Sequence, residues 1–149
     1  EGMQKMKNLE TENNKNIRSV LSGIYVKHGS DREFGFMTDA LNSSSGFSKY
    51  GALLNYGKFL LKCAPENVMK GMETIADIGF NHPQWFIRLS ATQALAEIAK
   101  SYGVDRPAGT NGGDAIIVST DNIKKKADEL VQQIKAKETD PQLLKIYQR

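Results

Sequence analysis

The stretch HPQWFIRLSATQALAEIAKSY, residues 82–102, decides the fold. Its apolar side chains recur at intervals of three and four residues, which is the spacing of one face of an amphipathic helix. Pro83 suits the first helical turn, because the amide hydrogen that proline lacks has no partner there. The small residues Ser90, Ala91 and Ala94 allow a neighbouring helix to approach closely. The stretch therefore predicts a helix over 84–102 that packs tightly against another helix.

Similar apolar stripes occur on both sides of this helix. They predict helices near 14–28, 31–42, 47–63, 66–79 and 121–138, and a final turn that starts at Asp140-Pro141. Ser30 and Glu33 have the spacing of a capping box. The segment 103–120 is rich in Gly, Pro, Asn and Asp, so we expect a loop there. No segment alternates as a strand does, and the expected fold class is all-α.

The predicted helices repeat with a period of about 35 residues. At this shift apolar residues align in three successive helices: Ile17, Ala52 and Ile87; Leu21, Tyr56 and Ala91; Ile24, Phe59 and Ala94; Tyr25, Leu60 and Leu95. The intervening helices align as well, with Met37 over Met72. A helix pair that recurs in this way is typical of a HEAT/armadillo-like α-α superhelix. We expect a right-handed superhelix of about three helix pairs with a Gly-rich loop before the last helix; a plain helical bundle is the alternative.

Two groups of residues are candidates for structural or surface roles. Arg88 is expected to stabilise the repeat by pairing with an acidic side chain of the preceding helix, such as Asp77. Trp85 lies beside the apolar stripe at the helix start and is interpreted as structural. Three consecutive lysines of the helix near 121–138 make it locally basic, and they are interpreted as a solvated face with a possible surface contact: Lys124, Lys125 and Lys126.

Composition excludes most chemistry for this chain alone. Its 149 residues suit one domain, and a net charge of +3 calls for neither a nucleic-acid nor a membrane partner. One cysteine excludes an internal disulfide, and two separated histidines, His28 and His82, form no recognisable catalytic set. Cys63 is expected to be buried and inert. We predict no catalytic, cofactor or metal residue here, and the first residues, Glu1-Gly2, suggest a piece of a longer polypeptide.

Four segments carry a resemblance to a known family. They are LETENNKNIRSVLSGIYVKHGS (9–30), SGFSKYGALLNYGKFLLK (45–62), HPQWFIRLSATQALAEIAKSYG (82–103) and IKAKETDPQLLKIYQR (134–149). Together they resemble the carboxy-terminal helical domain of bacterial M1-family zinc aminopeptidases. The zinc motif of that family, His-Glu-x-x-His, matches neither His28 nor His82, so none of the catalytic residues of the family is carried over.

The resemblance implies a non-catalytic role. The chain would close the active-site chamber over the catalytic domain of the same polypeptide and limit peptide access, meeting the peptide substrate only indirectly. Zinc is expected in that missing catalytic domain and no cofactor in this chain. The alternative is a free-standing HEAT-like repeat module that binds a protein or peptide. The resemblance leaves the bacterial cytoplasm and the periplasm equally open as the location.

Overall fold

The computed structural model describes residues 15–102 and 113–148, with the side chains of Ile17, of residues 19–102 and of residues 122–148. The described elements are α2 (Lys15–His28), a 3-10 turn η1 (Asp31–Glu33), α3 (Phe34–Ser43), α4 (Gly46–Leu60), α5 (Pro65–Asn81), α6 (Trp85–Tyr102), α7 (Gly113–Lys137) and α8 (Pro141–Tyr147). No strand occurs in these residues. The expected all-α fold class is confirmed.

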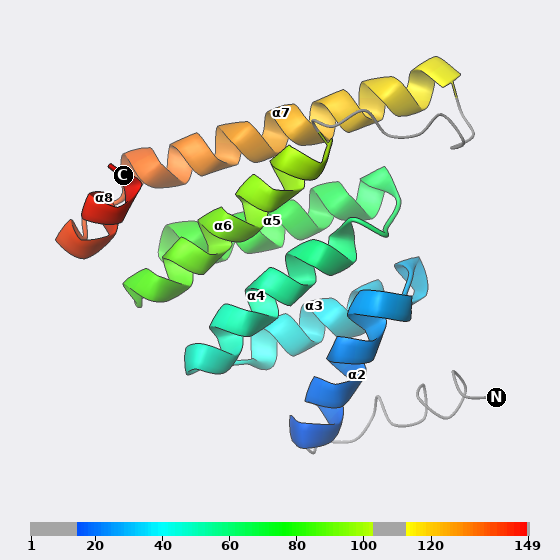
Figure 1. Ribbon diagram of the computed structural model, residues 1–149, viewed down its shortest axis with the longest axis horizontal. Helices are drawn as coiled ribbons and strands as arrows, with labels where there is room; N and C mark the ends of the chain where they lie inside the picture. The colour runs from blue at the N-terminus through cyan, green and yellow to red at the C-terminus, as the bar shows by residue number, and fades with distance from the viewer. Residues whose placement is uncertain (1–14, 103–112, 149) are drawn as a thin grey trace.

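The helices form two layers with a covering helix (Figure 1). Helices α2, α4 and α6 lie side by side in one layer, and α3 and α5 lie behind them. Helix α7 packs across α5 and α6, and α8 packs on α6. Successive helix pairs thus stack on one another as a helical superhelix, and among the described elements no helix lies in front of α2 and α4 in Figure 1.

Burial follows the repeat. The aligned residues Tyr25, Leu60 and Leu95 are each 0% exposed, and Met37 and Met72 are buried in the second layer. A side chain of this size stabilises the fold by about 1.5–3 kcal/mol when it leaves water completely. The same repeat position therefore supplies a core side chain in each of three successive helices, which is how a stacked repeat obtains a continuous core.

Small residues hold α4 and α6 close together, as predicted. A Cβ atom added at Gly57 would lie 3.3 Å from the Cβ atom of Ala94, tighter than ordinary contact. One turn earlier on α6, the Ser90 hydroxyl donates a 2.8 Å hydrogen bond to the backbone carbonyl of Tyr50. Because Ser90 is fully buried, this bond satisfies a polar group that would otherwise be costly. The two backbones therefore sit at a fixed, short separation.

Three predicted helix boundaries differ from the structure: the start of α7, the end of α5, and the end of α4, which lies at Leu60 and not near 63. Helix α7 begins at Gly113 and not near 121, so the expected loop 103–120 fails over 113–120, whereas 103–112 lies outside the described residues. Gly113 and Asp114 are residue types typical of loops, yet both are tolerated in a first helical turn, where an acidic residue is favourable. Helix α5 likewise continues to Asn81 instead of ending near 79. A Cβ atom at Gly79 would lie 3.2 Å from the Cβ of Ala91, so this glycine serves close packing and not a turn.

Side chains order two helix starts. Glu33 is buried, and its carboxylate accepts hydrogen bonds from the backbone N–H of Ser30 at 2.8 Å and from the Ser30 hydroxyl at 3.3 Å. These bonds supply the carboxylate half of the predicted capping box. The Asp140 carboxylate accepts a 2.8 Å bond from the N–H of Gln142, with Pro141 in the first turn of α8. The final turn predicted at Asp140-Pro141 is confirmed as this short helix.

Candidate functional site

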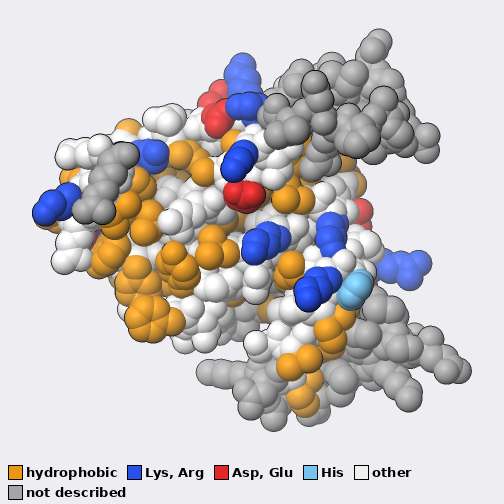
Figure 2. Space-filling model, in the orientation of Figure 1, with side chains coloured by type: hydrophobic (Ala, Val, Ile, Leu, Met, Phe, Trp, Pro, Cys, Tyr) orange, Lys and Arg blue, Asp and Glu red, His pale blue; other side chains and the backbone are white. Residues whose placement is uncertain are grey.

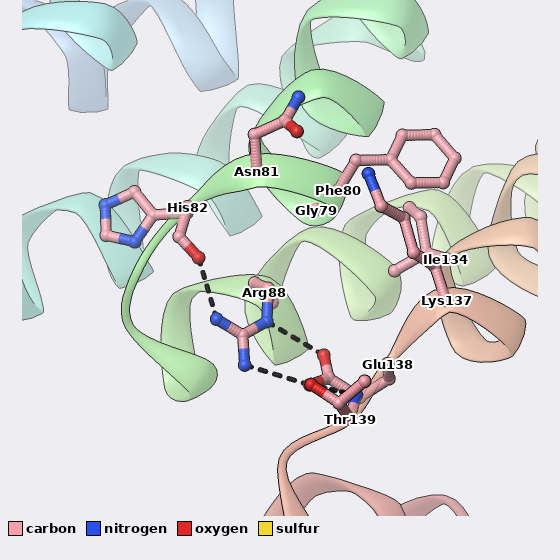
Figure 3. A pocket seen from close by; sticks show the side chains of 9 residues that line it. All are labelled: Gly79, Phe80, Asn81, His82, Arg88, Ile134, Lys137, Glu138 and Thr139. Carbon is pink, nitrogen blue, oxygen red and sulfur yellow. Dashed lines mark hydrogen bonds and ion pairs between the residues drawn. The ribbon is translucent and has the colours of Figure 1, made fainter.

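Arg88 and Glu138 form an ion pair that joins two inter-helix turns, and we call it the clasp (Figure 3). The guanidinium donates two nearly parallel hydrogen bonds to the carboxylate, from Nε at 2.8 Å and from one terminal nitrogen at 2.9 Å. Its other terminal nitrogen donates a 2.7 Å bond to the backbone carbonyl of His82. The side chains are 15% and 2% exposed. This two-pronged geometry is the strong form of an Arg–carboxylate contact.

The Glu138 carboxylate is held from its own turn as well. One oxygen accepts hydrogen bonds from the backbone N–H groups of Thr139 at 3.1 Å and Asp140 at 2.9 Å. Arg88 lies in the first turn of α6, and Glu138 directly follows α7. The clasp therefore fixes the turn between α7 and α8 against the turn between α5 and α6.

This pairing corrects the predicted partner of Arg88. Asp77 lies exposed on α5, where its carboxylate accepts a 2.9 Å hydrogen bond from the side-chain amide of Asn81. The helix preceding Arg88 in sequence offered Asp77 as the nearest plausible partner, but the end of α7 returns to the start of α6 and places Glu138 there. A structural ion pair at Arg88 was expected, and only its partner was wrong.

The electrostatics of the clasp follow from its geometry. The hydrogen bonds with Glu138 raise the pKa of Arg88, although partial burial opposes this. The hydrogen bonds from Arg88 lower the pKa of Glu138 below its usual value, against the opposite effect of burial. Burial lowers the pKa of His82, and the nearby positive charges of Lys49 and Arg88 lower it further. Both members of the clasp therefore stay charged at neutral pH, and His82 favours its neutral form.

A pocket of about 360 Å³ adjoins the clasp. Its walls are the ends of α5 and α7 with the residues that follow them: Gly79, Phe80, Asn81, His82, Arg88, Ile134, Lys137, Glu138 and Thr139 (Figure 3). The Lys137 ammonium lies 5.4 Å from the centre of the Phe80 ring, a cation–π contact. Arg88 and Glu138 are committed to each other. Two charged groups of the pocket thus serve the joint between helices, and we assign no ligand to it.

A second feature is a cluster of aromatic rings on the surface, formed by Phe47, Phe86 and Trp85; we call it the aromatic cluster. Phe47 is 84% exposed and its ring stacks on that of Phe86, with centroids 5.2 Å apart and planes inclined by 25°. Trp85 meets Phe86 edge to face at 6.1 Å. Trp85 was expected to be structural, and it is half-buried with this one ring contact described. Hydrophobic side chains gather over this end of α4 and α6 (Figure 2).

Sequence analysis missed Phe47 as a surface residue. It is one of the apolar residues of the helix predicted over 47–63, like Leu53 and Phe59, yet those two side chains are 0% exposed and Phe47 is 84% exposed. Phe47 stands at the second position of α4, where the ring of Phe86 covers only part of it, whereas neighbouring helices bury the later residues. The proximity of Phe47 to the Ser-rich turn before the helix was the only signal of its exposure in the sequence.

Lysines gather at the opposite end of the same layer. Lys27, Lys58 and Lys62 are exposed, and the Lys62 ammonium donates to the backbone carbonyl of Lys27, which brings α2 and α4 together; we call these three the lysine cluster. Figure 2 shows basic side chains over the carboxyl-terminal ends of these helices. Such lysines also interact favourably with the negative ends of the helix dipoles.

The three lysines singled out from sequence lie on α7. Lys124 pairs with Asp128 at 2.7 Å, with both side chains about half exposed. Lys125 is exposed and Lys126 is half-buried. An exposed pair at this spacing contributes only about 0.3–0.5 kcal/mol. Their geometry matches a solvated helix face.

The remaining reactive side chains are isolated. Burial raises the pKa of the Cys63 thiol to about 12, and the nearby carboxylates of Asp31 and Glu33 act in the same direction. Within residues 15–102 and 113–148, no three His, Cys, Asp or Glu side chains come together as ligands for a metal ion. The helices of the described part of the chain also include none with the length and hydropathy of a membrane span.

Comparisons with known proteins identify no relative, so the clasp and the two surface clusters are interpreted from their chemistry alone. No family model matches the chain, and neither the search of curated proteins nor the search of solved structures found a match. The class supported by the observations above is an all-α helical superhelix with an internally satisfied clasp.

Proposed function

We propose that this chain is the non-catalytic carboxy-terminal helical domain of an M1-like zinc aminopeptidase. In this role it packs against the catalytic domain of the same polypeptide, closes the active-site chamber and limits the length of peptide that enters. The proposal rests on the resemblance of the four sequence segments described above, and stacked helix pairs suit a role that needs shape and surface. Zinc belongs to the catalytic domain in this proposal.

The observation that carries the packing role is the exposure of Phe47. A phenylalanine that is 84% exposed and stacks on a second ring leaves apolar area in water. Large aromatic side chains grouped on a surface mark contacts with another protein surface. Covering Phe47 would contribute up to about 2–3 kcal/mol from burial alone. A partner domain seated on the aromatic cluster accounts for this arrangement.

The complete gene provides the first test. We expect a His-Glu-x-x-His motif several hundred residues upstream of this segment in the same gene. A native start codon near residue 1 would contradict the proposal and would leave the free-standing repeat module, whose partner is a separate protein. The aromatic cluster favours a protein partner in both cases.

Activity of the complete protein provides the second test. Without this domain, we expect hydrolysis of a single aminoacyl reporter to persist while the preference for short peptides over long ones is lost. The purified 149-residue chain is expected to show no turnover of the reporter with added zinc. A preference for short peptides that survives removal of the domain would refute the chamber role, and turnover that copurifies with the isolated chain would refute the non-catalytic role.

A further inference from the structure

One strip of α4 runs from Phe47 of the aromatic cluster to Lys58 of the lysine cluster. Phe47 and Lys58 are eleven residues apart, which is close to three full turns, so both side chains leave the same side of the helix. The half-buried Leu54 lies two turns after Phe47 on that side. With a rise of 1.5 Å per residue, the strip from Phe47 to Lys58 is roughly 16 Å long. It therefore joins an apolar end to a basic end along the accessible side of α4.

The described part of the basic end carries more positive than negative charge. Among the residues that the structure describes, none of the three lysines of this cluster takes part in an ion pair. Asp31 lies near this end, where its carboxylate accepts hydrogen bonds from the backbone N–H of Ala64 at 3.0 Å and from the Asn67 side chain at 2.7 Å. Its single negative charge stands against three ammonium groups, so this end keeps an excess of positive charge. The ammonium groups thus present positive charge to any surface that covers α4.

We propose that this strip binds an acidic segment of the partner domain, with an apolar side chain on the aromatic cluster and carboxylates over the lysine cluster. Charge complementarity selects this occupant, since three cations at one end need anions across the contact. A second copy of the chain would bring a molecule of net charge +3 to the same lysines. The inference rests on the proposed packing role, and it names the chemistry of the surface that packs there.

The length of the strip defines a probe. An extended chain advances about 3.3 Å per residue, so about five residues separate an anchor on Phe47 from carboxylates near Lys58. A suitable probe is the blocked peptide Trp-Gly-Ser-Gly-Ser-Gly-Glu-Glu-Glu-Glu. The matched control peptide replaces each Glu by Gln. Amide NMR shifts of the full 149-residue chain, followed during titration, report both affinity and location.

We expect the Glu peptide to bind weakly, shift amides at both ends of α4 and lose affinity with added salt. Phe47→Ala and the double variant Lys58→Gln/Lys62→Gln should each weaken binding at least fivefold. Lys70→Gln should leave affinity unchanged, because Lys70 is also an exposed lysine but lies on α5, the rear layer, where it pairs with Glu66 at 3.6 Å. The folded fraction of each variant, measured by urea unfolding, separates loss of contact from loss of structure.

Several outcomes would overturn the inference. If the Gln peptide binds as tightly as the Glu peptide, the lysine cluster does not contribute to recognition. Binding of heparin or phosphatidylserine vesicles to the lysine cluster, without binding of the Glu peptide, would replace an acidic protein segment by an anionic polymer or lipid surface. Self-association that Phe47→Ala abolishes in sedimentation would identify a second copy as the occupant.

This test is separable from that of the proposed function. A start codon near residue 1 would refute the proposal that this chain is part of an aminopeptidase, but it would not affect binding of the Glu peptide. If the chamber role holds but the Glu peptide does not bind, the partner domain covers α4 through other chemistry.

Discussion

The clasp and the strip of α4 differ in whether their side chains find partners within the chain. In the clasp, Arg88 and Glu138 satisfy each other at 2.8 and 2.9 Å, and Glu138 is almost inaccessible to water. On the strip, Phe47 is 84% exposed, and the cations at the other end face solvent. The first region completes its interactions within the chain, whereas the second leaves them open. Substitutions should therefore act on stability in the clasp and on association on the strip.

Of the substitutions in the clasp and on the strip, the one with the largest expected effect lies in the clasp. Arg88→Met leaves the Glu138 carboxylate 2% exposed without its cation, and removal of one partner from a buried pair is strongly destabilising. We expect a loss of about 2–4 kcal/mol in the free energy of unfolding, reduced from the fully buried case because Arg88 keeps some solvent contact. Urea unfolding measures this loss.

Asp77→Asn is the matched control, because Asp77 is the carboxylate that sequence analysis assigned to Arg88. It should change the free energy of unfolding by less than about 0.5 kcal/mol. If Arg88→Met and Asp77→Asn change the free energy of unfolding equally, the clasp contributes no more to stability than an exposed carboxylate does.

The second effect concerns pH. The pKa of Glu138 is lower in the folded chain than its usual 4.5, so the ionised form stabilises the fold above that pH. This stability should be lost progressively as pH falls from about 4.5 through the lower folded-state pKa. Glu138→Gln should flatten this part of a plot of unfolding free energy against pH.

His82 contributes at higher pH. Its pKa is lowered from 6.5, so the neutral ring is favoured in the fold, and acid begins to cost stability below about pH 6.5. Glu138→Gln should leave the onset of this loss near pH 6.5. If the unfolding free energy of the unchanged chain and that of Glu138→Gln depend identically on pH below 4.5, the clasp is not the acid-sensitive contact.

A smaller effect is expected on the strip. Phe47→Ala removes a side chain that is 84% exposed, so the free energy of unfolding should change by less than about 0.5 kcal/mol. Phe59→Ala on the same helix should cost about 3–5 kcal/mol, because Phe59 is 0% exposed. A large cost at Phe47 in urea unfolding would show that its stack on Phe86 belongs to the core.

The smallest effect belongs to the lysines of α7. Lys124→Ala breaks an exposed pair with Asp128 and should cost only a few tenths of a kcal/mol, decreasing with salt. Lys125→Ala should cost less still. Thermal unfolding at two salt concentrations checks both, and a salt-independent loss at Lys124 would point to packing by its aliphatic stem.

The helical periodicity of the sequence predicted much of the fold. Tyr25, Leu60 and Leu95 were aligned by the repeat, and each is completely buried. Such positions can be read from local apolar spacing, because every turn of an amphipathic helix places an apolar residue on its buried face. The start of α7 was missed for a related reason: Gly and Asp are common in loops, and only tertiary packing or helix-end chemistry distinguishes a helix that begins with them.

The candidate site was less predictable. Arg88 was recognised as the residue of an ion pair, but its partner lies fifty residues away in sequence. Many carboxylates satisfy charge pairing in principle, and only the crossing of α7 over α6 brings Glu138 to Arg88. Exposure of Phe47 depends equally on which neighbours stop short of the end of α4. Both features depend on how helices end in space, which periodicity does not encode.

The close approach of Gly57 to Ala94 has a consequence for the surface two to three turns away. Because α4 and α6 touch there almost backbone to backbone, their spacing also sets the separation of Phe47 and Phe86 at the helix starts. A larger side chain at 94 would wedge the two helices apart and unstack the rings without touching either. The smallest residues of the interior thus determine the shape of the most exposed aromatic surface.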